Sequence, residues 1–89
     1  MKLNIEGKNA LITGGANGIG EAISNDLAKV GVNIYVTSRS RRNIDNLKKK
    51  LRRYNVKVEG VVIDFLKKNY LKKIKKFLKL KKIDILVNN

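Results

Sequence analysis

The sequence predicts an α/β fold, in which a parallel sheet carries helices on both faces. Four short apolar runs have the length and nearly continuous hydrophobicity of strands buried in a parallel sheet. Between them, apolar residues recur at the three- and four-residue spacing of amphipathic helices. Strands that alternate with such helices indicate βαβ units, and 89 residues give room for one small domain.

The expected strands are short runs that differ in composition. The second is rich in β-branched and aromatic residues, and the third alternates before it becomes continuous. In chain order the runs are 10–13, 32–37, 56–63 and 83–87. Their order along the chain places a helix between each strand and the next.

The expected helices each show one apolar face. The faces are formed by Ile19, Ile23, Leu27 and Val30, by Ile44, Leu47, Leu51 and Tyr54, and by Leu71, Ile74 and Leu78 with Tyr70 and Phe77 beside them. Gly31 follows the first face, where a glycine can end a helix. Lysine clusters separate the apolar positions of the later segments, so we interpret them as solvated helix faces.

The composition excludes several classes of site. The chain has no cysteine, which excludes disulfides and cysteine-based metal sites. It has no histidine, which removes the commonest metal ligand, the commonest general base and any Ser-His-Asp triad. No secretory signal and no membrane-length apolar run is found, so we expect a cytoplasmic protein with no membrane span.

The charge is strongly positive, with 21 Lys and Arg against 7 Asp and Glu, a formal net charge of +14. Such an excess raises the question of a polyanionic partner, either nucleic acid or an anionic membrane surface. The alternative is compositional drift, because a chain rich in Lys, Asn and Ile is typical of A+T-rich coding. We favour drift, so a nucleic-acid partner is not expected.

Four glycines lie between the first strand and the first helix, at positions 14, 15, 18 and 20. Such a turn brings backbone N–H groups together with the positive end of a helix dipole, which suits a phosphate. Without side chains, the backbone can approach a dinucleotide pyrophosphate closely. A tight turn alone would also use glycines, but the position between strand and helix favours nucleotide binding.

The glycine spacing is T-G-x-x-x-G-I-G, from Thr13 to Gly20, rather than G-x-G-x-x-G. In this motif the sequence resembles the short-chain dehydrogenase/reductase family. Three more features agree: the opening at 3–13, an Asp after the third strand, and D-I-L-V-N-N at 84–89, which is similar to the family's fourth strand and the start of its N-N-A-G motif. The resemblance implies that 1–89 is the N-terminal part of an NAD(P)-binding, Rossmann-type domain, truncated after about four strands.

The resemblance also implies roles for individual residues. The implied cofactor-binding residues are Gly14, Asn17, Gly18, Ile19, Gly20, Asp64 and Asn89, with Asn88 beside the last. The glycines would line the pyrophosphate turn, and Asn17 and Ile19 would add contacts. Asp64 would contact the adenine, and the two asparagines would lie near the adenosine ribose. In the alternative interpretation Asp64 caps the turn after its strand, and the asparagines form a frayed terminus.

The end of the second strand predicts the cofactor. NAD-preferring folds place a carboxylate there for the ribose 2′-OH, but this chain reads V-T-S-R-S-R-R at 36–42. A guanidinium can bind the 2′-phosphate that a carboxylate would repel. We therefore predict NADP(H) over NAD(H), with Ser38 and Arg39 as contacts. In the alternative interpretation, Arg41 and Arg42 are only the first residues of the next helix. The N-terminal end of a helix is an unfavourable place for cations.

The family's catalytic Ser, and its Tyr followed four residues later by Lys, lie beyond the N-N-A-G motif. Tyr35, Tyr54 and Tyr70 are followed at that spacing by Arg, Val and Ile. We therefore expect no catalytic residue here and no turnover by this chain alone. The predicted function is the NADP(H)-binding N-terminal fragment of an oxidoreductase that, at full length, transfers hydride to or from a carbonyl or alcohol substrate and forms a homo-oligomer.

Two alternatives belong to other functional classes. One is a basic, non-enzymatic module that binds nucleic acid or an anionic surface through its lysine-rich helices. It lacks an aromatic platform for stacking bases, since the chain has only three Tyr and two Phe. The other is a gene remnant without function. No residue of a substrate pocket can be recognised, so the sequence does not identify a substrate.

Overall fold

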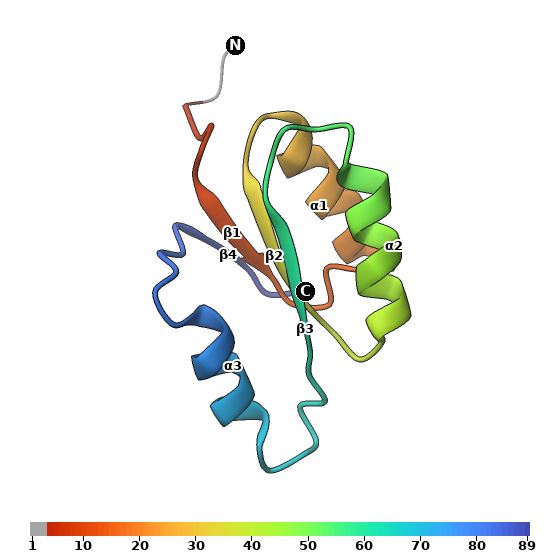
Figure 1. Cartoon of the computed structure of the whole chain (residues 1–89), viewed down its shortest axis with the longest axis vertical. Coiled ribbons are helices and arrows are strands. Elements are labelled where there is room, and N and C mark those ends of the chain that lie inside the picture. The colour runs from red at the N-terminus through yellow and green to blue at the C-terminus, as the bar shows by residue number, and fades with distance from the viewer. Residues whose placement is uncertain (1–3) are drawn as a thin grey trace.

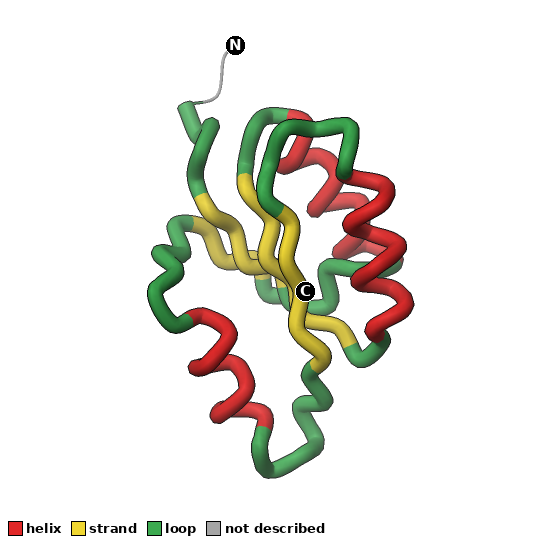
Figure 2. The backbone as a smooth tube through the Cα atoms, viewed as in Figure 1, coloured by secondary structure: helices red, strands yellow, loops and turns green. Residues whose placement is uncertain are grey.

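The computed structural model describes residues 4–89 and contains one parallel, four-stranded sheet in the strand order β3-β2-β1-β4. The elements are β1 (Asn9–Ile12), α1 (Gly18–Lys29), β2 (Asn33–Ser38), α2 (Arg41–Leu51), β3 (Val58–Val62), α3 (Tyr70–Leu78) and β4 (Ile85–Val87). Figure 2 shows the strands side by side at the centre. The predicted Rossmann-type α/β fold is confirmed.

Helices lie on both faces of the sheet, with α1 and α2 on one side and α3 on the other (Figure 1). Successive residues of a strand point to opposite faces, and β2 shows this alternation directly. Val36 faces the first pair of helices and belongs to the same buried core as Ile44 and Leu47 of α2. Tyr35 faces α3, where its ring meets that of Phe77 edge to face at 6.1 Å.

The prediction of strands buried on both faces holds for the two central strands only. Every residue of β2 after Asn33 is buried, and so is every residue of β1 after Asn9. The outer strands β3 and β4 have no buried residue. The outer strands are less buried because each has one neighbouring strand instead of two. The third strand is also shorter than predicted, since the run at 56–63 forms a strand only over Val58–Val62.

The packing face of α1 is only partly the face that the apolar spacing predicts, since Ile23 and Leu27 are half-buried against the core. Ile19 is 74% exposed and Val30 lies beyond the helix end, whereas Gly20, Ser24 and Ala28 are buried. Small residues face the sheet because the helix lies close to it. The apolar spacing of α2 is confirmed, with Ile44, Leu47 and Leu51 all buried.

The third helix covers its face of the sheet only partly. Of the predicted face, Ile74 and Leu78 are half-buried, but Leu71 is exposed, and no residue of α3 is buried. Within residues 4–89, no helix combines the length and apolar character needed to cross a membrane.

Candidate functional site

The glycine turn joins β1 to α1 with a backbone that only glycine adopts easily. Gly14 and Gly18 have φ angles of +62° and +57°, in the left-handed region. Gly20 has no room for a side chain, because a Cβ there would lie 2.1 Å from the carbonyl oxygen of Gly14. The turn therefore folds back against the first turn of α1.

A buried serine holds this turn in place. The hydroxyl of Ser24 lies 3.0 Å from the carbonyl oxygen of Gly15 and 2.9 Å from that of Gly20, and donates to them. Ser24 is fully buried on α1. The sequence reasoning missed it, although a serine among the apolar positions of a helix is a signal of a buried polar contact.

The N-terminus of α1 is open to an anion. Asn17 is the N-cap residue with an extended backbone, and its side chain makes no capping hydrogen bond. The first N–H groups of a helix have no partner within the helix. Asn17, Gly18 and Ile19 are exposed here, and nothing lies within 4 Å of where a Cβ of Gly18 would be. The turn thus presents free backbone donors beside open space.

A cavity of about 400 Å³ lies at the carboxyl ends of the strands. It is lined by Thr13, Gly14, Thr37, Ser38, Arg39, Ile63, Phe65, Asn88 and Asn89. The structure therefore brings Gly14, Ser38, Arg39 and Asn89 together, whereas the other predicted turn residues, Asn17, Gly18, Ile19 and Gly20, do not line this cavity. Thr13, Thr37, Ile63 and Phe65 were missed, because only the sheet order shows that these strand ends meet.

Hydrogen bonds connect this cavity's walls. The N–H of Gly14 donates to Oγ1 of Thr37 at 3.2 Å, which ties the turn to β2. The N–H of Asn89 donates to Oγ1 of Thr13 at 2.9 Å, and its Nδ2 donates to the carbonyl oxygen of Gly14 at 3.3 Å. Asn89 is thus held against the glycine turn, in contrast to the frayed terminus of the alternative interpretation.

Arg39 extends from the loop between β2 and α2. The preceding Ser38 is buried, and its hydroxyl accepts from the N–H of Ser40 at 3.1 Å. Ser40 in turn caps α2 by accepting from the N–H of Asn43 at 3.2 Å. Arg39 itself is exposed, and the ion pairs among residues 4–89 do not include it. Its guanidinium group is therefore free to bind an anion.

Asp64 does not line this cavity. It lines a neighbouring cavity of about 440 Å³, together with Arg39, Val62, Lys67, Asn69 and Lys73. Its Oδ1 accepts from the N–H of Leu66 at 3.0 Å. This contact is the turn cap of the alternative interpretation, and it leaves the other carboxylate oxygen open.

The cavity at the strand ends has the chemistry of a binding site. It offers the polar side chains of its threonines, Ser38 and asparagines, the apolar side chains of Ile63 and Phe65, and the cation of Arg39. Its lining, as far as residues 4–89 form it, contains no carboxylate, tyrosine or lysine. These residues can therefore hold an anionic ligand with an apolar ring, but they include no ordinary general acid or base.

Comparison with known proteins identifies relatives of the whole chain. The family model described as short chain dehydrogenase matches residues 8–89. Hydroxysteroid dehydrogenase-like protein 1 of Gallus gallus is 40% identical over 85 residues, which cover 93% of this chain and 26% of that protein. The chain thus spans about a quarter of the length of the curated relatives it matches.

Solved structures agree with this match. L-sorbose reductase from Gluconobacter frateurii, complexed with NADPH and L-sorbose, superposes with a TM-score of 0.91 at 32% identity, over 100% of this chain and 35% of that one. An NAD⁺-bound xylitol dehydrogenase has a TM-score of 0.83 at 24% identity, over 94% of this chain and 33% of that one. The second similarity supports the fold alone.

Proposed function

This chain belongs to the short-chain dehydrogenase family, and we propose that it binds NADP(H) as the N-terminal, cofactor-binding part of an oxidoreductase. The observation that carries this proposal is the free guanidinium of Arg39 in the cavity that adjoins the glycine turn. When bound in the complete enzyme, the cofactor would supply hydride exchange with a carbonyl or alcohol substrate.

The residues present fit a dinucleotide. The turn leaves open space beside Gly18. At residue 20 a side chain would collide with the carbonyl oxygen of Gly14, so only glycine lets the helix start this close to the turn. These glycines would hold the pyrophosphate, with Asn17 and Ile19 beside them at the start of α1. Ser38, Arg39 and Asn89 would contact the adenosine end. The open oxygen of Asp64 lies next to the same region and remains our candidate for the adenine contact.

The preference for NADP(H) over NAD(H) follows from the end of β2. A carboxylate at this place would bind the ribose 2′-OH and repel a 2′-phosphate. Ser38 and Arg39 stand here instead, and the arginine can form two parallel hydrogen bonds to a phosphate. L-sorbose reductase, which was solved with NADPH, supports this assignment, whereas the NAD⁺-bound neighbour shows that the fold alone does not decide it.

Calorimetric titration with NADPH and with NADH tests the proposal. We expect NADPH to bind about tenfold more tightly or better, since charge-assisted hydrogen bonds contribute roughly 1.5–3 kcal/mol. Arg39→Asp should abolish this preference. Arg42→Asp is the control, because Arg42 lies outside the cavity and a carboxylate suits the first turn of α2. Equal affinities in the unaltered chain, or an unchanged preference in Arg39→Asp, would contradict the assignment.

A further inference from the structure

A second, basic cavity lies beside the first and shares one residue with it. This basic cavity, of about 440 Å³, is lined by Arg39, Val62, Asp64, Lys67, Asn69 and Lys73. Arg39 lines both cavities, so the two cavities adjoin at this residue. A group bound at Arg39 from the first cavity is therefore within reach of the second.

The basic cavity has an excess of positive charge. Arg39, Lys67 and Lys73 line it against the single carboxylate of Asp64. The two ion pairs found within residues 4–89 join Lys50 to Glu21 and Lys81 to Glu59. No carboxylate therefore lies within 4.0 Å of the charged nitrogens of these three cations, which leaves them available to an anion.

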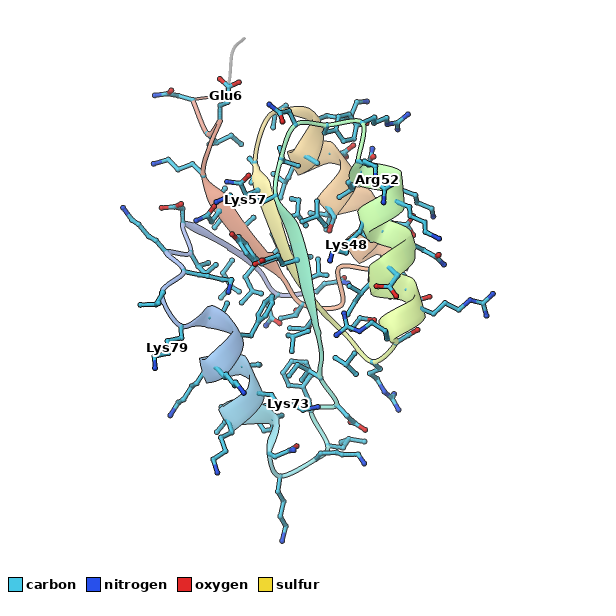
Figure 3. All side chains as sticks on the ribbon, viewed as in Figure 1. Glu6, Lys48, Arg52, Lys57, Lys73 and Lys79 are labelled. Atoms are coloured by element: carbon cyan, nitrogen blue, oxygen red, sulfur yellow. The ribbon has the colours of Figure 1, made fainter. Side chains whose placement is uncertain are left out.

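The two lysines come from a different part of the chain than Arg39. Lys73 belongs to α3, and its Nζ donates to the carbonyl oxygen of Val62 at the end of β3, at 3.3 Å (Figure 3). Lys67 lies in the segment between β3 and α3, where its N–H donates to the carbonyl oxygen of Asp64 at 3.0 Å. The side chain of Lys73 thus connects α3 to the end of β3, and the backbone bond of Lys67 closes the turn that begins at Asp64.

We propose that Lys67 and Lys73 complete, with Arg39, the binding site for the 2′-phosphate of NADP(H). This inference rests on the proposed function. A phosphate monoester carries a charge of about −1.5 to −2 at neutral pH, more than one guanidinium neutralises. Three cations against one carboxylate leave a net charge that matches it. Part of the cofactor preference then comes from the segment after β3, and not from the end of β2 alone.

The test measures the dissociation constants of NADPH and NADH for the chain and for the double variant Lys67→Gln/Lys73→Gln. We expect NADPH to bind at least about fivefold more weakly, because two charged contacts are lost, and NADH to be unaffected. Lys73→Arg keeps the charge and should keep the preference. Lys79→Gln is the matched control, since Lys79 caps the other end of α3 and lines neither cavity (Figure 3).

The possible results separate a failure of the proposed function from a failure of the inference about Lys67 and Lys73. If the unaltered chain binds neither dinucleotide, the proposed function fails and the inference fails with it. If the double variant keeps its preference while Arg39→Asp loses it, only the inference is overturned. An equal loss in Lys79→Gln would also overturn it, because the effect would then be that of total charge. Circular dichroism checks the fold, and if the double variant unfolds, the single variants Lys67→Gln and Lys73→Gln decide in the same way.

Discussion

Gly20 shows how a single residue shapes the site. A Cβ at this position would lie 2.1 Å from the carbonyl oxygen of Gly14 and 2.8 Å from Nδ2 of Asn89. The obstacle is mainly backbone, which cannot turn away as a side chain can. We expect Gly20→Ala to force the turn apart and to lower the free energy of unfolding by roughly 1–3 kcal/mol, as overpacking does. The thermal midpoint of the helical circular dichroism signal measures this.

Gly18→Asn is the matched control for this substitution. Gly18 has a φ of +57°, which Asn tolerates better than most residues, and open space where its Cβ would be. The midpoint should therefore change little. If Gly20→Ala were as stable as Gly18→Asn, the close approach of α1 to the turn would not constrain residue 20.

Some site residues were predictable from sequence and others were not. The glycines and Arg39 could be predicted, because each depends on its place after a strand. Thr37, Phe65 and Lys73 could not, because their closeness depends on the order β3-β2-β1-β4 and on where α3 lies. A polar residue directly after a strand can be recognised as lying at the edge of the sheet. The sequence does not show which other strands end beside it.

At the scale of elements, Tyr35 connects β2 to α3. Its ring meets Phe77 edge to face at 6.1 Å, and Nζ of Lys81 lies 5.9 Å from its centroid. Lys81 also pairs with Glu59 of β3, at 3.7 Å. Burial, and then the negative charge of Glu59, raise the pKa of the Tyr35 hydroxyl above its ordinary value of 10.0.

This shift has a defined consequence for stability. The folded state holds the Tyr35 proton more tightly than the unfolded state does, so the corresponding stabilisation is complete below the ordinary pKa. It is lost as pH rises through the higher pKa of the folded state. Titration of tyrosinate absorbance, as the difference between the chain and Tyr35→Phe, should give a midpoint above 10.0. A midpoint at or below that value would show that α3 does not cover this ring.

The helices also show where pattern reasoning succeeds. In α2, large apolar residues at helical spacing are the ones that become buried, so the pattern predicts the packing face. In α1 the same reasoning places Ile23 and Leu27 correctly against the core, but it also chooses Ile19 and Val30, which are exposed. The fully buried residues of α1 are Gly20, Ser24 and Ala28. Small residues are required where α1 lies close to the sheet. The spacing of apolar residues does not indicate how close a helix will lie to the sheet.

At the scale of the whole molecule, the core is one-sided. The buried apolar cluster lies between the sheet and the α1–α2 layer, whereas α3 has no buried residue. Large apolar side chains remain in solvent, among them Leu66 at 90%, Leu80 at 99% and Leu86 at 66% exposed. A net charge of +14 adds self-repulsion to this limited burial. Chains of this size are marginally stable even with a complete core.

We therefore predict that the 89-residue chain, as a monomer, unfolds without a sharp cooperative transition. Scanning calorimetry should show a broad heat absorption, because α3 and β4, which have no buried residue, can separate before the α1–α2 layer melts. NADPH at about 100 times its dissociation constant should stabilise the folded state by about 2.7 kcal/mol and sharpen the transition, since it binds only where the strand ends meet. A sharp transition in a verified monomer without ligand would contradict this prediction, and would mean that the half-covered face contributes more to stability than its burial indicates.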